Sequence, residues 1–146
     1  PLLREEEISR LPGSFWFLLG VAGAAAAFPE PVAVMSELHL AVGDPAAAVV
    51  GSLFGASTRC LPREKSLAGF AAAAAACAAV TGALVGGGIL LPTGMLANAP
   101  MVAVAASLYG GLCGAVAEAW PWGVDDNLSM PLVSGGLFSL FYATLV

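Results

Sequence analysis

Acidic side chains at two places in a strongly apolar chain are the residues best suited to chemistry. Asp125 and Asp126, followed by Asn127, lie between two long apolar segments, and Asp44 interrupts a third. Ionisable groups are costly next to lipid and usually mark a functional site there. Together with Lys65, which also borders an apolar segment, these acids provide what metal-assisted chemistry on a nucleotide phosphate needs.

The composition indicates an integral membrane protein. Hydrophobic residues make up 59% of the chain and charged residues 10%, against roughly 25% charged in ordinary soluble domains. The apolar runs are continuous rather than alternating, so we expect spanning helices and an all-α fold. The net charge of −5 and the lack of a basic stretch argue against nucleic-acid binding.

The 146 residues are expected to form a single transmembrane domain, with residues 1–12 as a polar segment at the membrane surface. Proline and glycine mark the connections between apolar passes. We predict five transmembrane helices, the first of them short, over residues 13–28, 32–55, 67–91, 101–120 and 128–146. Pro45 removes a helical amide, so we expect the second helix to be broken near Asp44 and Pro45.

The basic residues predict how the chain is oriented. With five spans, all five cations fall on one side of the membrane, as in proteins that follow the positive-inside rule. Asp125 and Asp126 return to the same side as Lys65, so the separate polar groups are expected to meet there.

Asp44 has two interpretations. It shares one helical stripe with Glu37, Gly51 and Gly55, and a carboxylate at a helix break is a common way to build an ion site in a membrane. Alternatively, Asp44 only caps the second half of its helix.

The segment around Gly51 and Gly55 is also open to two interpretations. GxxxG spacing usually serves helix packing, but this pair leads into Arg59, Arg63 and Lys65. Those cations either contact a phosphate or only set topology. The sequence contains neither a P-loop nor a Rossmann turn.

Asp125, Asp126 and Asn127 could simply cap the last helix. One cap needs one short polar residue, however, and Glu118 lies two turns back from Asp125, on the preceding span. Three carboxylates converging at one end of a helix pair favour a divalent cation, and hard oxygen ligands suit Mg²⁺.

In this order, the motifs resemble the CTP-dependent lipid kinase family, which includes dolichol kinase, phytol kinase and the CTP-using diacylglycerol kinase and is related to phosphatidate cytidylyltransferases. The resemblance covers nearly the whole chain. It is carried by residues 13–20, Gly43-Asp-Pro-Ala-Ala47 with Gly51 and Gly55, Lys65-Ser-Leu-Ala-Gly69, and Glu118 with Asp125-Asp-Asn-Leu-Ser-Met-Pro-Leu132.

The resemblance implies a polytopic enzyme that phosphorylates a lipid alcohol, such as phytol, a polyprenol or diacylglycerol, with CTP and Mg²⁺. Asp44, Asp125 and Asp126 are then the expected metal ligands, and Asp44, Lys65 and Asp126 the expected catalytic residues. Substrate binding is expected from Gly51, Gly55, Arg63, Asn127 and Glu118.

Two departures keep a second hypothesis open. Ala68 stands where the family pattern has glutamate, and N-terminal spans of typical members are not found in this chain. Both fit a pseudoenzyme, a non-catalytic accessory subunit packed among other membrane subunits. Resemblance to phytol kinase implies a plastid membrane, envelope or thylakoid, for either form, with a photosynthetic complex as the assembly expected for an accessory subunit. The endoplasmic reticulum is the other expected location.

Overall fold

The structure, a computed structural model, describes residues 12–62, 65–91, 100–119 and 123–145. Its helices confirm the all-α fold, and most of their ends lie within a few residues of the predicted ones. They are α1 (Gly13–Ala27), α2 (Glu30–Phe54), the 3₁₀ turn η2 (Gly55–Ser57), α3 (Leu67–Gly86), α5 (Pro100–Glu118) and α6 (Asp126–Tyr142).

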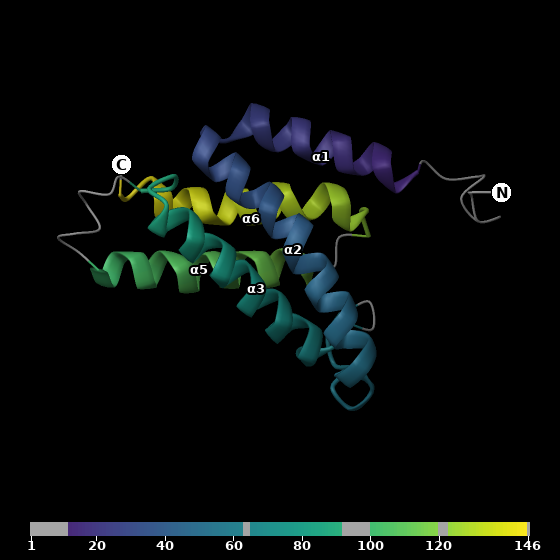
Figure 1. The fold of residues 1–146 in the computed structure, drawn as a ribbon. Coiled ribbons are helices and arrows are strands. Elements are labelled where there is room, and N and C mark those ends of the chain that lie inside the picture. The colour runs from purple at the N-terminus through teal and green to yellow at the C-terminus, as the bar shows by residue number, and fades with distance from the viewer. Residues whose placement is uncertain (1–11, 63–64, 92–99, 120–122, 146) are drawn as a thin grey trace.

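The helices form two sets that cross each other. Helices α1, α6 and α5 run side by side, and α2 and α3 cross them diagonally (Figure 1). Helix α3 packs most extensively against α2 and α5, while α6 contacts α1, α2 and α5. The end of α5 and the start of α6 therefore lie at the same end of the bundle.

Three helical segments are long and apolar enough to cross a membrane: Glu30–Ser57, Leu67–Gly86 and Pro100–Glu118. Helix α1 is apolar but has 15 residues, and α6 has 17. The structure thus supports three of the five predicted spans by length and composition, and crossing by α1 and α6 stays a prediction.

The predicted break in the second helix is wrong. Helix α2 continues through Pro45 to Phe54. A proline inside a helix removes one hydrogen bond and crowds one carbonyl, and neighbouring helices can hold the remaining turns together. Extensive packing of α2 on α3 accounts for its continuity.

Glycines on α5 allow its close approach to α3. A Cβ atom on Gly114 would lie 2.4 Å from the Sγ atom of Cys77, and one on Gly111 would lie 2.6 Å from the carbonyl oxygen of Ala74. The packing role expected of the GxxxG spacing is therefore confirmed for Gly110 to Gly114. This contact holds α5, which ends at Glu118, against α3.

Candidate functional site: an acidic cluster with a lysine and a pocket

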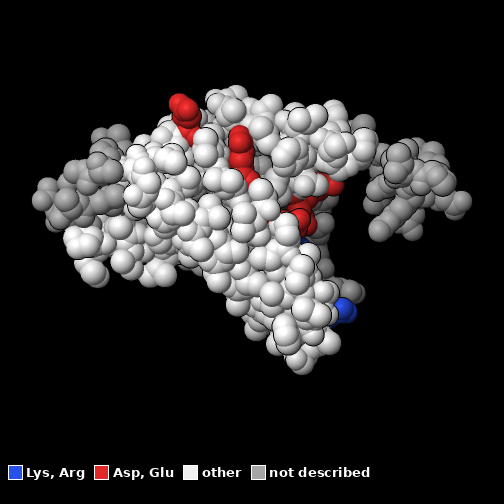
Figure 2. Space-filling view, in the orientation of Figure 1, with Lys and Arg blue, Asp and Glu red and all other residues white. Residues whose placement is uncertain are grey.

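Three carboxylates from three helices meet at one end of the bundle. Asp44 lies midway along α2, Glu118 is the last residue of α5, and Asp126 is the first residue of α6. One ligand oxygen from each lies within 4.8 Å of the others. Figure 2 shows a face that is mostly uncharged, with acidic side chains at a few places. Residues 44, 118 and 126, from three different helices, thus form one acidic cluster.

Asp125 caps helix α6, whereas its neighbour Asp126 belongs to the acidic cluster. The Oδ1 atom of Asp125 accepts hydrogen bonds from the backbone N–H of Asn127 at 3.0 Å and from Asn127 Nδ2 at 2.9 Å. This is the geometry of a helix N-cap. Because Asp125 ends the loop and starts the helix, Asp126 falls on the first helical position and reaches the acidic cluster.

Lys65 ties two members of the cluster together. Its Nζ atom lies 3.0 Å from Glu118 Oε1 and 3.1 Å from Asp126 Oδ2, and it also donates to the backbone carbonyl of Glu118. The Glu118 side chain is only 9% exposed, so its charge needs a partner. Lys65 offsets part of the negative charge of the three carboxylates, and Arg59 lines the adjacent pocket beside Glu118.

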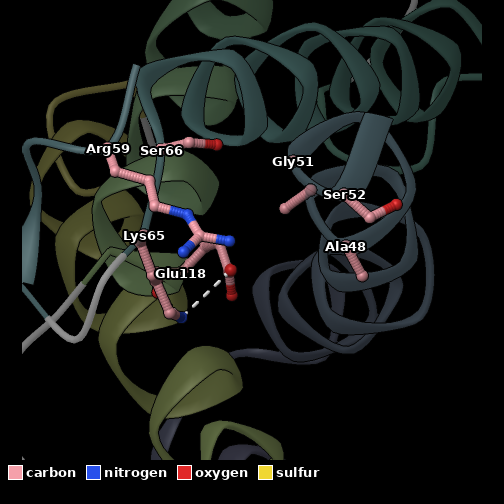
Figure 3. Close-up of a pocket in the computed structure, with 8 residues that line it drawn as sticks. Ala48, Gly51, Ser52, Arg59, Lys65, Ser66 and Glu118 are labelled. Carbon is pink, nitrogen blue, oxygen red and sulfur yellow. Dashed lines mark hydrogen bonds and ion pairs between the residues drawn. The ribbon is translucent and has the colours of Figure 1, made fainter. Parts of the chain in front are cut away.

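A pocket of about 240 Å³ opens beside the cluster. Figure 3 shows Arg59, Lys65 and Glu118 on one side and α2 on the other. The wall from α2 contains small residues, and Ser66 forms part of the remaining lining. The complete lining is Ala47, Ala48, Gly51, Ser52, Arg59, Lys65, Ser66 and Glu118.

The start of α3 forms the floor of this region. Ser66 is the N-cap of α3, and its Oγ atom accepts a hydrogen bond from the Gly69 N–H at 3.1 Å. Glycines surround it closely, since a Cβ atom on Gly55 would lie 2.8 Å from Ser66 Oγ and one on Gly51 would lie 3.3 Å from it. The positive end of the α3 dipole and two cationic side chains therefore border the same pocket.

The acidic cluster has the chemistry of a divalent cation site. Two oxygens bound to one Mg²⁺ at about 2.1 Å are at most about 4.2 Å apart, so ligand atoms within 4.8 Å need only a small adjustment. The Oε2 atom of Glu118 is buried and has no hydrogen-bond partner among the described residues, and the Lys65 contact uses the other oxygen. Residues 44, 118 and 126 thus fit a hard cation.

The structure brings some predicted site residues together and gives others different surroundings. Asp44, Asp126 and Lys65 meet, and Gly51 lines the adjacent pocket. Glu118, expected to contact substrate, has its carboxylate in the acidic cluster.

The capping contact of Asp125 with Asn127 differs from the ligand role expected for Asp125, and Gly55 packs on Ser66. Arg63 lies outside the described residues.

Sequence reasoning left the role of Arg59 open and missed those of Ser52 and Ser66. All three line the pocket. Arg59 pairs across an isolated β-bridge with Ser66, next to Lys65, a contact that depends on the fold and is not visible in the sequence. Ser66 lies in the Lys65-Ser-Leu-Ala-Gly69 stretch that carries the resemblance, which could have drawn attention to it, whereas Ser52 belongs to no motif beyond the Gly51 to Gly55 spacing.

Fold and site together define a helical membrane protein in which most of the charged side chains that the structure describes meet at one end of the bundle. No family model and no solved structure matches the chain. It is similar to three curated proteins, each named CTP-dependent diacylglycerol kinase 1. The protein of Schizosaccharomyces pombe is 36% identical over 145 residues, which cover 96% of this chain and 65% of the relative.

The other two relatives come from Eremothecium gossypii and Saccharomyces cerevisiae. The first is 31% identical over 159 residues, covering 99% of this chain and 48% of the relative. The second is 31% identical over 147 residues, covering 91% of this chain and 49% of the relative. The chain belongs to the CTP-dependent lipid kinase family. It spans about half to two thirds of the length of these relatives.

Proposed function

We propose that this site transfers the terminal phosphoryl group of CTP to the hydroxyl group of a membrane lipid, with diacylglycerol as the first choice of acceptor. The observation that carries the proposal is the meeting of Asp44, Glu118 and Asp126 around Lys65. Phosphoryl transfer depends mostly on positioning and on neutralising charge. The cluster and the adjacent cationic pocket supply groups for both tasks.

The pocket is suited to the phosphate end of the nucleotide. Its volume of about 240 Å³ is below the range of about 300–1,000 Å³ usual for sites that enclose a whole ligand. Arg59 and Lys65 face it (Figure 3), and Arg in particular matches phosphate oxygens with paired hydrogen bonds. We therefore assign the phosphates to the pocket and leave the cytosine base outside it.

Residues 44, 118 and 126 are the proposed ligands for Mg²⁺. When bound, this ion would neutralise the charge of the phosphates. The chain itself sets the arrangement: Lys65 holds Glu118 and Asp126 close together, and the Asp125 cap fixes where α6 begins. Asp44 enters from α2, the helix that also forms the pocket wall.

In the proposed reaction, the lipid hydroxyl oxygen forms a bond to the γ-phosphorus of CTP. The bond between that phosphorus and the oxygen bridging to the β-phosphate breaks, and CDP leaves with the bonding electrons. The hydroxyl proton goes to a carboxylate. Asp44 is suited to accept it, because Lys65 forms ion pairs with the other two acids.

The names of the relatives favour diacylglycerol as the acceptor. Phytol and polyprenols are the other members of the same chemical class, since each presents one hydroxyl group on an apolar body. The plastid and endoplasmic reticulum locations stay predictions. Membership of the family supports lipid and CTP as substrates, and whether further subunits bind this chain is a separate question.

The test is direct. Purified protein in lipid nanodiscs is given CTP labelled at the γ-phosphate, Mg²⁺ and one lipid alcohol at a time, and the labelled lipid is measured. We expect transfer to diacylglycerol from CTP. A protein that transfers no label to any of the three alcohols, and that co-purifies in fixed ratio with other membrane subunits, would support the accessory-subunit hypothesis instead.

A further inference from the structure

Among the described residues, two prolines lie in helix interiors, beyond the first turn, and each frees a backbone carbonyl close to an acid of the site. Pro45 is in α2 and Pro131 is in α6. Proline has no N–H, so the carbonyl four residues earlier loses its usual helical partner. The two carbonyls affected belong to Ala41, three residues before Asp44, and to Asn127, directly after Asp126.

The protein covers the Asn127 carbonyl with its own backbone. Helix α1 approaches so closely that a Cβ atom on Gly20 would lie 2.4 Å from the Asn127 oxygen and 3.0 Å from Pro131 Cγ. The backbone of α1 therefore covers the Asn127 carbonyl where α1 packs against α6.

The Ala41 carbonyl has different surroundings. Ala41 and Pro45 are both exposed, on a helix long and apolar enough to lie in a membrane. A backbone carbonyl without a donor is costly in lipid, and such groups at membrane depth usually find a partner or line a cavity. The exposed face of α2 therefore presents a hydrogen-bond acceptor that the helix itself does not use.

This acceptor is aligned with the proposed site. Ala48 and Ser52 line the pocket, and on an ideal helix both point within about 20° of the direction of Ala41. Helical carbonyls point toward the C-terminus, so the Ala41 oxygen lies within about one turn, about 5.4 Å along the axis, of Asp44. One face of α2 thus carries, in chain order, the freed carbonyl of Ala41, the carboxylate of Asp44 and the residues of the pocket wall.

We propose that the Ala41 carbonyl is the docking acceptor for the hydroxyl group of the lipid substrate, an inference that rests on the proposed function. The hydroxyl is the only hydrogen-bond donor of a diacylglycerol, and lipid reaches an exposed helix face directly from the bilayer. The contact forms when the lipid binds. The hydroxyl then exchanges the carbonyl for the neighbouring carboxylate of Asp44 before phosphoryl transfer.

Replacing Pro45 tests this without removing any side chain that binds substrate. Pro45→Ala restores an N–H that occupies the Ala41 carbonyl within the helix, so folding should be unchanged or improved. Pro31→Ala is the matched control, because Pro31 lies in the first turn of α2, where the N–H groups have no helical partner. Pro45→Leu repeats the test with a larger side chain.

Binding is measured in nanodiscs without nucleotide, for diacylglycerol and for an analogue in which hydrogen replaces the hydroxyl. We expect wild-type protein and Pro31→Ala to prefer the alcohol about fivefold to tenfold, as one neutral hydrogen bond predicts. Pro45→Ala and Pro45→Leu should lose that preference. In turnover, both Pro45 variants should show a raised KM for lipid, with kcat not lowered and KM for CTP unchanged.

The inference is overturned if both Pro45 variants keep the preference for the alcohol within twofold of wild type. It is also overturned if KM for CTP rises as much as KM for lipid, because the variants would then distort the whole site. The proposed function can fail separately. Wild-type protein that shows the Pro45-dependent preference but transfers no phosphate from CTP would retain the docking contact and refute the kinase.

Discussion

Gly20 of α1 lies so close to the first turn of α6 that a methyl group cannot be added without moving one of the helices. A Cβ atom there would lie 2.4 Å from the backbone oxygen of Asn127 and 3.3 Å from the Cα of Leu128. Both atoms belong to the backbone and cannot rotate away. Gly23, three residues further along α1, would place its Cβ 3.2 Å from Leu132 Cδ2, which is the end of a flexible side chain.

The expected cost follows from these distances. An ordinary carbon-to-oxygen contact is about 3.3 Å or more, so Gly20→Ala requires α1 to move by about 1 Å. Overpacking of this kind costs about 1–3 kcal/mol, while Ala in place of Gly within a helix gains about 1 kcal/mol. We expect Gly20→Ala to lower the free energy of unfolding by about 0–2 kcal/mol. Gly23→Ala, with little strain, should raise it by about 1 kcal/mol.

Thermal unfolding of both variants in one detergent measures the difference. At about 4 °C per kcal/mol for a domain of this size, Gly20→Ala should unfold about 4–12 °C below Gly23→Ala. Because Asn127 follows Asp126 directly, only Gly20→Ala should also lower kcat. Equal Tm values for the two variants would refute the close packing of α1 on α6 described here.

Three further predictions concern the acidic cluster. Asp126→Asn should reduce turnover by at least about a hundredfold, as for loss of a main electrostatic group, whereas Asp125→Asn should cost less than about fivefold because Asn caps a helix as well as Asp; equal losses would assign Asp125 to the cation after all. Lys65→Met should likewise reduce turnover about a hundredfold. Unlike Asp125→Asn, it should also raise KM for CTP. Steady-state kinetics with varied CTP measure both values, and an unchanged KM for CTP would contradict the assignment of Lys65 to the phosphates. Chelation of divalent ions should abolish transfer and Mg²⁺ should restore it, and turnover that persists in excess chelator would exclude the proposed cation.

Local signals in the sequence predicted much of this architecture. Pro29, Pro100 and the capping residues around Asp125 marked helix ends that the structure places within a few residues. The expectation that Asp44 would approach the second acidic group also agrees with the structure, where it meets Asp126. Apolar length and the spacing of acids are properties of short segments, so they can be recognised without knowing the fold.

Tertiary packing decided the features that the sequence did not predict. Pro45 favours a break, but contacts of α2 with α3 keep the helix continuous. Two adjacent aspartates compete for one cap, and the structure shows that Asp125 takes it and that α6 begins at Asp126. The close approach of α5 to α3, which Gly111 and Gly114 permit, also depends on contacts between residues that are distant in sequence.

The central claim is that this chain uses residues 44, 118 and 126 to transfer a phosphoryl group from CTP to a lipid alcohol. The most direct measurement is the formation of phosphorylated diacylglycerol from γ-labelled CTP and Mg²⁺ by purified wild-type protein and by Asp126→Asn, side by side in nanodiscs. We predict labelled lipid with the wild type and at least about a hundredfold less with the variant. Equal labelling by both, or none by folded wild-type protein with CTP and Mg²⁺ present, would contradict the account.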